Sequence, residues 1–179
     1  REAFAAYLQL DVPALTLLSS RAERRNGYIL EQLSFDLGTG TPVRGLLTRP
    51  LAAGYYPAIL YAHSHGDRYD IGAGELLEGR EYLLSPWGPL LAQNGYVTLS
   101  IDMPTFASQG QQTESSAAKA LIWYGKSLIG KMIEQEMAAL TYLASRHDVD
   151  PQRLGGFGIS LGSTLTYWQA AVDERLKAI

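Results

Sequence analysis

Residues 153–162 read RLGGFGISLG. The first part is a compact, glycine-rich apolar run typical of a buried strand, and apolar residues at helical spacing follow from Leu161 to Val172. The pattern G-x-S-x-G falls at the junction. A strand that turns directly into a helix strains the central residue and lifts its side chain clear of the sheet, while small flanking residues avoid a collision. The segment therefore predicts Ser160 as an exposed nucleophile, with a merely tight glycine-rich turn as the alternative.

Other glycine-rich motifs do not match this segment. A dinucleotide-binding fingerprint G-x-G-x-x-G that starts at Gly156 requires glycine at position 161, where Leu161 stands. A phosphate-binding loop requires a Gly-Lys pair that is absent. Both nucleotide-binding interpretations are excluded.

Outward from the segment, strand and helix patterns alternate. Buried strands are predicted at 58–62 and 96–101, the second ending at Asp102, with a helix at 81–93 between them. A long helical segment from 121 to 143 should break near Gly125 or Gly130, and residues 175–179 begin another strand. Alternation of this kind predicts an α/β fold with a mostly parallel sheet and helices on both faces.

The N-terminal part differs in pattern. Residues 28–37 and 43–48 alternate around the turn Gly38-Thr39-Gly40, which predicts an antiparallel hairpin. Residues 1–25 are interpreted as a helical N-terminal extension on the single domain 1–179.

Composition narrows the classes of function. The chain of 179 residues is 46% hydrophobic and 18% charged with net charge −3, which gives no electrostatic reason to expect a nucleic-acid partner. No stretch is apolar for long enough to predict a membrane span. The absence of cysteine excludes disulfides, thiolate metal sites and a cysteine nucleophile, and leaves both the compartment and the oligomeric state open.

A second functional signal follows the strand at 58–62. A serine esterase needs two backbone N–H donors for the oxyanion, one from the residue after the nucleophile and one from a loop after a neighbouring strand. Leu161 and the loop 65–67 have these positions, with Asp67 as the first choice and Gly66 as the alternative. His63 and His65 are expected to shape this loop; zinc binding and direct substrate contact are the other options, and no acidic or cysteine ligand at a zinc spacing supports the metal.

Residues 28–179 resemble the α/β-hydrolase fold, in particular its dienelactone hydrolase-like and acetyl xylan esterase-like branch, and are close to prolyl oligopeptidase-type domains. The His65-Gly66 loop, the strand that ends at Asp102, and residues 149–162 carry the resemblance. It implies that Asp102 is structural. Ser163 stands where a second glycine is frequent, and Ser160 stands where dienelactone hydrolase has cysteine, so the dienelactone reaction is not implied.

The triad of this fold is incomplete in the sequence. A serine nucleophile needs a histidine base and an orienting carboxylate, which in this fold follow the serine in chain order. After Ser160 come Asp173 and Glu174 but no histidine, and His147 has the position of a surface residue. We expect the chain to be the first portion of a longer hydrolase that supplies both groups and further C-terminal strands; a new arrangement around the existing histidines and a non-catalytic remnant are the alternatives.

These observations predict a serine hydrolase that cleaves carboxylic esters through an acyl-enzyme on Ser160, without metal or organic cofactor. A small-molecule ester is the expected partner. Loops at the carboxyl ends of the strands should line its pocket, with Tyr69, Met103, Pro104 and Phe106 as candidates. A peptidase or acyltransferase on the same machinery, and a non-catalytic binding module, are the alternatives.

Overall fold

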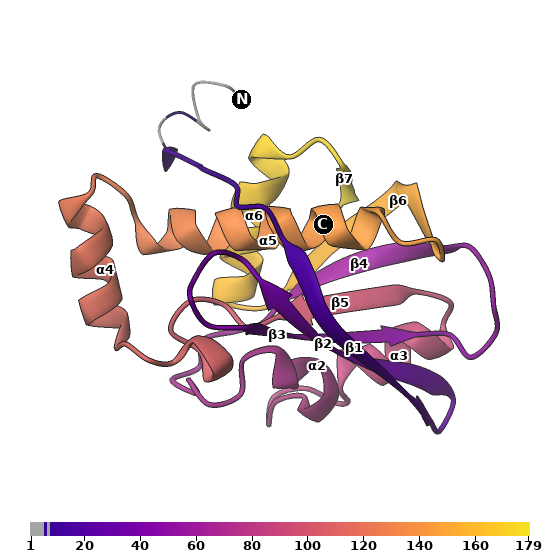
Figure 1. The fold of residues 1–179 in the computed structure, drawn as a ribbon. Helices are drawn as coiled ribbons and strands as arrows, with labels where there is room; N and C mark the ends of the chain where they lie inside the picture. Colours follow the sequence, from indigo (N-terminus) through magenta and orange to yellow (C-terminus); the bar gives the residue numbers. More distant parts are fainter. Residues whose placement is uncertain (1–5, 7) are drawn as a thin grey trace.

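The computed structural model describes residue 6 and residues 8–179, and these form a mixed sheet flanked by helices (Figure 1). The sheet has seven strands in the order β1-β2-β3-β5-β4-β6-β7. The strands β3, β5, β4 and β6 form its centre. Their bounds are β1 Thr16–Arg25, β2 Tyr28–Asp36, β3 Val43–Arg49, β4 Tyr56–Ala62, β5 Val97–Ile101, β6 Val149–Gly158 and β7 Leu176–Ala178.

The sheet divides into two parts by strand direction. β1, β2, β3 and β5 pair antiparallel in that order, whereas β4 is parallel to both β5 and β6, and β6 is parallel to β7. The prediction of an α/β fold is confirmed, but the sheet is mixed and not mostly parallel, because β1, β2 and β3 add three antiparallel pairings. The carboxyl ends of β4 and β6 lie side by side because Ala62 pairs with Gly158.

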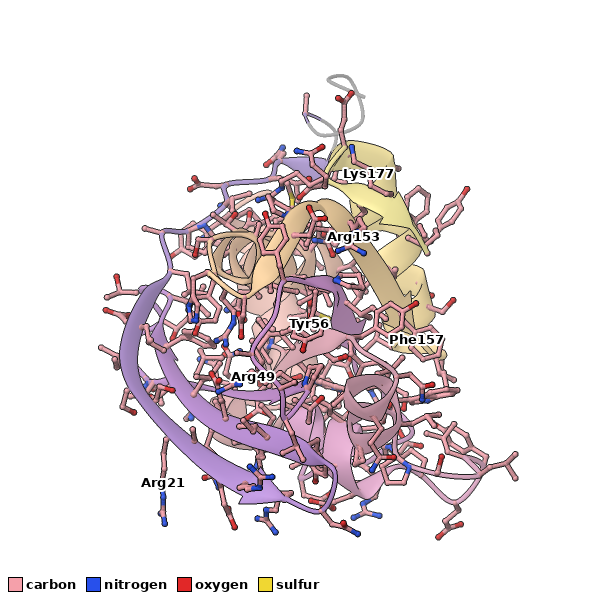
Figure 2. All side chains as sticks on the ribbon, turned by 90° about the vertical axis from the view of Figure 1, so that its right-hand side faces the viewer. Arg21, Arg49, Tyr56, Arg153, Phe157 and Lys177 are labelled. Atoms are coloured by element: carbon pink, nitrogen blue, oxygen red, sulfur yellow. The ribbon has the colours of Figure 1, made fainter. Side chains whose placement is uncertain are left out.

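The prediction of a helical extension over 1–25 is wrong for Thr16–Arg25, which forms strand β1; residues 1–5 and 7 lie outside the described residues. Every residue of β1 is exposed, so no buried face marks it as a strand in the sequence. The strand is held by its pairing with β2 across the two-residue turn Asn26-Gly27, where Gly27 has φ +85°. Asn-Gly between two strands is a strong hairpin signal and could have identified β1. Figure 2 shows Arg21 pointing away from the body of the molecule.

Helices cover both faces of the sheet, with α5 and α6 on one side and α2 and α3 on the other (Figure 1). The predicted break in the long helical segment is confirmed at Gly125, whose φ of +70° ends the run between α4 and α5. The helix predicted from 81 begins only at Trp87, because Pro86 disfavours helical backbone at the residue before it. The bounds are α2 Glu75–Glu78, α3 Trp87–Gln93, α4 Glu114–Trp123, α5 Leu128–Ala144 and α6 Leu161–Val172, with short 3-10 turns at Gly72–Gly74 and Ala107–Gln109. None of the helices in the described residues has the length and apolar character that a membrane crossing requires.

The core on the α5 side contains an ionisable group. Glu136 is fully buried, and neither of its carboxylate oxygens has a hydrogen-bond partner among the described residues. It lies one helical turn from Met132 and from Leu140, which both belong to the core. Burial raises the pKa of Glu136 from its ordinary 4.5 to about 8. The folded protein therefore holds a proton there that the unfolded chain releases above its ordinary pKa.

This buried carboxyl predicts a pH dependence of stability. The stability that the protonated Glu136 contributes to the folded state is full below about pH 4.5 and is lost as the pH rises towards 8. Glu136→Gln cannot ionise, so its free energy of unfolding should fall less than the wild type's across that window, by about 1–3 kcal/mol. Urea unfolding at several pH values measures this difference, with Glu23→Gln on exposed β1 as the control. Parallel wild-type and Glu136→Gln profiles would contradict the prediction.

Candidate functional site

Ser160 lies between the end of β6 at Gly158 and the start of α6 at Leu161. Its backbone angles, φ 56° and ψ −118°, fall in a region that non-glycine residues rarely adopt. The residue is exposed. The sharp strand-to-helix turn predicted from the G-x-S-x-G pattern is therefore present, and it places a strained serine at the surface above the carboxyl ends of the parallel strands.

The two glycines of the motif allow the turn to close. A Cβ on Gly162 would overlap the carbonyl oxygen of Ala62 at the end of β4, and a Cβ on Gly158 would overlap the backbone of Gly162. The first turn of α6 thus lies directly against the end of β4. As a consequence, the loop that follows β4 begins beside Ser160.

The predicted backbone donors differ in their hydrogen bonding. The N–H of Leu161, in the first turn of α6, donates to no partner in the described part of the chain. The N–H of Asp67 donates to Nδ1 of His65 at 3.1 Å. No such bond engages the N–H of Gly66 within residues 8–179. Both Gly66 and Asp67 have positive φ, 52° and 53°. The first-choice donor is therefore occupied here, and the alternative is not.

His65 belongs to a cluster that the sequence analysis missed. Its Nε2 lies 3.0 Å from Oε2 of Glu114, the first residue of α4. The hydroxyl of Tyr69 donates to the same oxygen at 2.7 Å. The hydrogen bond from His65, followed by that from Tyr69, lowers the pKa of Glu114. Because Glu114 is 49 positions from His65 in the chain, no local sequence pattern indicates this pairing.

A buried carboxylate, that of Glu75, holds the start of the loop after β4 through hydrogen bonds. Glu75 accepts hydrogen bonds from the hydroxyl of Tyr61 at 2.6 Å, from the backbone N–H and hydroxyl of Ser64, and from Nε of Arg80. Burial alone raises the pKa of Glu75, but these bonds outweigh it and leave the pKa below its ordinary value. Arg80 also donates to the carbonyls of Ser64 and His65. The start of the loop is therefore tied to an ion pair inside the protein.

The other two histidines lie apart from Ser160. His63 is fully buried, and its Nε2 accepts the backbone N–H of Met103 at 3.2 Å. Burial lowers the pKa of His63, which favours the neutral ring. His147 is exposed beyond the end of α5. Among the described residues, neither of them nor His65 forms a hydrogen bond with Ser160.

Asp102 has the geometry of a structural residue, as the resemblance implies. Its carboxylate accepts from Nε and Nη2 of Arg44, at 3.1 and 3.0 Å, and from the backbone N–H groups of Ala73 and Ser108. These four donors occupy its oxygens. The carboxylate joins β3, the end of β5 and the two 3-10 turns.

Two of the predicted pocket residues are placed differently from the prediction. Met103 and Phe106 are fully buried, in a cluster with Leu128 and Leu165, so their side chains have no surface to offer a substrate. Apolar side chains directly after β5 are drawn into the core under α5 and α6. Tyr69 is 39% exposed and stacks on Phe106 with ring centroids 5.0 Å apart. Pro104 is also buried, so Tyr69 is the exposed member of the predicted set.

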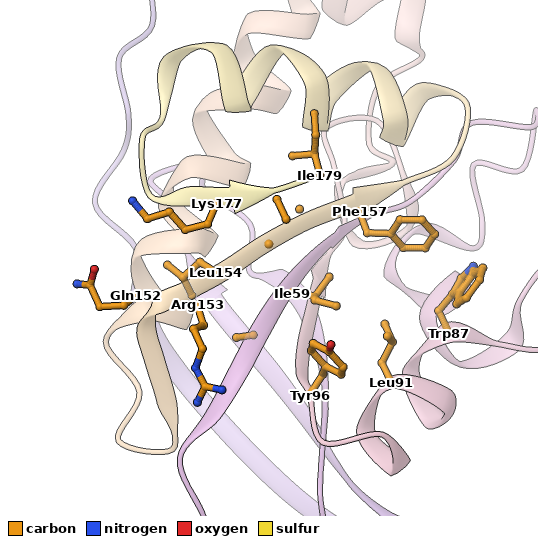
Figure 3. A pocket seen from close by; sticks show the side chains of 14 residues that line it. Ile59, Trp87, Leu91, Tyr96, Gln152, Arg153, Leu154, Phe157, Lys177 and Ile179 are labelled. Carbon is orange, nitrogen blue, oxygen red and sulfur yellow. The ribbon is translucent and has the colours of Figure 1, made fainter.

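Two hollows on the surface lie near the parallel strands that carry Ser160. One, of about 700 Å³, lies beside Tyr69, Thr105 and Glu114. The other, of about 590 Å³, is apolar and lies over β4, β6 and β7 on the side of the sheet that carries α3 (Figure 3). Figure 3 shows Trp87 and Leu91 from α3 on one side of this second hollow and Ile179 on the other. Ser160 lines neither hollow. The first adjoins the loop after β4, and so does a third of about 450 Å³ that is lined by Gly66, Arg68 and Tyr82.

The fold of the chain is similar to those of solved structures. A solved structure described as a "putative acetyl xylan esterase" from Bacteroides fragilis superposes with a TM-score of 0.76, at 21% identity, over 98% of this chain and 49% of that chain. Acetyl xylan esterase 1 from Thermoanaerobacterium superposes with a TM-score of 0.67, at 17% identity, over 98% and 55%. The chain has an α/β-hydrolase fold.

Sequence comparison adds a protein from Bacillus subtilis named "Putative hydrolase YtaP". It is 38% identical over 159 residues, which cover 88% of this chain and 53% of the relative. This chain thus spans about half the length of that relative. No family model matches this chain.

Proposed function

We propose that Ser160 is the nucleophile of a carboxylic ester hydrolase. The observation that carries this proposal is the exposed serine with φ 56° and ψ −118° at a strand-to-helix turn, next to an N–H of α6 that has no partner in the described residues. The esterase names of the superposed structures support ester cleavage as the hydrolytic reaction. Placement at the carboxyl ends of parallel strands agrees with the usual site of ligand binding in such sheets.

The reaction follows from these groups. The Oγ of Ser160 bonds to the acyl carbon while a base removes its proton, and the carbonyl oxygen becomes an oxyanion. The N–H of Leu161 stabilises this charge, together with a donor from the loop after β4. The alcohol then leaves with the proton, and water releases the acid from the acyl-enzyme and restores Ser160.

For the second donor, the hydrogen bonding favours Gly66 over Asp67. Asp67 would have to give up its bond to His65 before its N–H could reach an oxyanion. Gly66 requires no such exchange. We therefore propose the N–H groups of Leu161 and Gly66 as the pair, with Asp67 as the alternative, and Tyr69 as a side chain that contacts the ester.

The base and its orienting acid are proposed to lie outside residues 1–179, in further strands and helices that follow β7. His63 is enclosed in the core, His65 is engaged by Glu114, and His147 lies beyond the far end of α5. The relatives are about twice as long as the part that this chain matches, which leaves room for both groups. The apolar hollow over β4, β6 and β7 is a surface that such elements would cover.

A labelling experiment tests the nucleophile. The full-length natural protein should react with a fluorophosphonate, and mass analysis of its peptides should locate the adduct on Ser160. The same preparation should hydrolyse short p-nitrophenyl esters. Labelling without ester turnover would favour a peptidase or acyltransferase, and a protein that neither labels nor turns over ester would refute the proposal.

A further inference from the structure

The loop that supplies the second oxyanion donor has a conformation that its own residues disfavour. Gly66 and Asp67 both have left-handed backbone angles, and Asp67 carries a side chain, so its φ of 53° is uncommon. One local hydrogen bond helps to close the turn, from the N–H of Arg68 to the carbonyl oxygen of His65 at 3.1 Å. The single hydrogen bond that the N–H of Asp67 makes, to Nδ1 of His65, spans this turn.

That hydrogen bond requires one particular form of the histidine ring. Because a backbone N–H donates to Nδ1, this nitrogen must carry the lone pair, and the proton of the neutral ring must be on Nε2. Nε2 lies 3.0 Å from Oε2 of Glu114, which can only accept when it is ionised. The carboxylate of Asp67 also faces the ring, but it is exposed and lies 3.6 Å from Nδ1, beyond hydrogen-bond distance, so the closer carboxylate of Glu114 selects the tautomer that the loop needs. The lowered pKa of Glu114, caused by His65 and then Tyr69, keeps the carboxylate ionised.

The ring is also held in place by its neighbours. It meets Tyr69 and Phe106 edge-on, with centroid distances of 5.0 and 5.3 Å. Phe106 is fully buried, so core packing fixes the position of its ring against His65. Three contacts from separate parts of the chain thus orient one side chain, and that side chain orients the backbone of the loop.

We propose that Glu114 is a positioning residue for the oxyanion loop, a role that rests on the proposed ester hydrolysis. Through the tautomer of His65, the carboxylate at the start of α4 holds residues 65–67 in the left-handed turn beside Ser160. Glu114 also borders the hollow of about 700 Å³ with Tyr69, so the proposed role, called the relay below, is specifically its action through His65 and not a contact with the ester. The relay acts on transition-state stabilisation because it fixes a backbone donor, which predicts an effect on kcat with little effect on KM.

The kinetic test uses the full-length protein and a p-nitrophenyl ester. Glu114→Ala should lower kcat about tenfold, with KM changed by less than about twofold. Glu114→Gln keeps an oxygen that accepts from Nε2, so it should rescue kcat to within about threefold of wild type. Lys119→Ala, an exposed change on the same helix, is the control for general damage to α4 and should leave kcat unchanged. An unchanged kcat in Glu114→Ala, or equal losses in the Ala and Gln variants, would overturn the proposal.

A spectroscopic test is independent of activity. Nitrogen-15 NMR distinguishes the two neutral tautomers of histidine, and the signals of the three histidines can be assigned with His65→Gln. Wild-type His65 should show the proton on Nε2, and Glu114→Ala should mix the two forms. If the wild type hydrolyses no ester, the proposed function fails, and the NMR result alone then decides the relay. A proton on Nδ1 in the wild type, or no change in Glu114→Ala, would refute it.

Discussion

Replacement of Ser160 by alanine should abolish ester hydrolysis by the full-length protein, with a loss in kcat on the order of 10⁴ to 10⁶-fold. No other group in the described residues has the same combination of an exposed hydroxyl, a strained strand-to-helix turn and a free N–H on the next residue. The remaining rate would come from the backbone donors and from substrate binding, which do not need the hydroxyl. Steady-state kinetics with a p-nitrophenyl ester measures the loss, and fluorophosphonate labelling should disappear with it.

The fold should survive this substitution. A φ of 56° costs alanine about as much free energy as it costs serine, so the backbone strain does not change. No hydrogen bond is lost either, because the Oγ of Ser160 forms none with the described residues. The urea midpoint should therefore stay close to that of wild type. Ser163→Ala, at an exposed position of α6, is a hydroxyl-deletion control that should keep full activity. Activity in Ser160→Ala within tenfold of wild type would show that the nucleophile lies elsewhere.

Replacement of Gly162 by alanine should destabilise the protein by about 3–5 kcal/mol. The added Cβ would overlap the carbonyl oxygen of Ala62 and approach that of His63 to 3.0 Å, and both are backbone atoms that cannot rotate away. Relief requires that α6 move away from the end of β4. That movement would also displace Ser160 and Leu161, so activity should fall with stability.

Ser163→Ala is the matched control for Gly162→Ala, because it changes the next residue of α6 to the same side chain at an exposed position. Its free energy of unfolding should differ from wild type by less than about 0.5 kcal/mol. Chemical denaturation monitored by tryptophan fluorescence gives both values. If Gly162→Ala were as stable as Ser163→Ala, the close approach of α6 to β4 would not exist in solution.

Local patterns were sufficient for the elements that surround Ser160. The strand, the G-x-S-x-G turn and the amphipathic helix follow one another in the chain, so hydrophobic periodicity and glycine positions predicted both the elements and the strained serine. The break at Gly125 was predictable for the same reason, since a positive φ at glycine is a local property.

Pairings between distant residues could not be predicted in this way. β1 has no buried face, so hydrophobic periodicity did not reveal it, although the Asn26-Gly27 turn that joins it to β2 is a local hairpin signal. The bond between His65 and Glu114 depends on where α4 is placed against the loop after β4. Residues after β5 were predicted to face a substrate, but Met103 and Phe106 turn into the core.

By itself, the sequence determined an α/β chain with one strained serine between a buried strand and a helix, because those features depend on neighbouring residues. Only the tertiary structure decided which N–H groups near that serine are free and what holds the loop beside it. The physical reason is that the hydrogen bonds donated by the N–H of Asp67 and by the ring of His65 depend on how β4, α4 and the loop after β4 pack together. Such packing is set by the whole core and leaves no periodic signal in the chain.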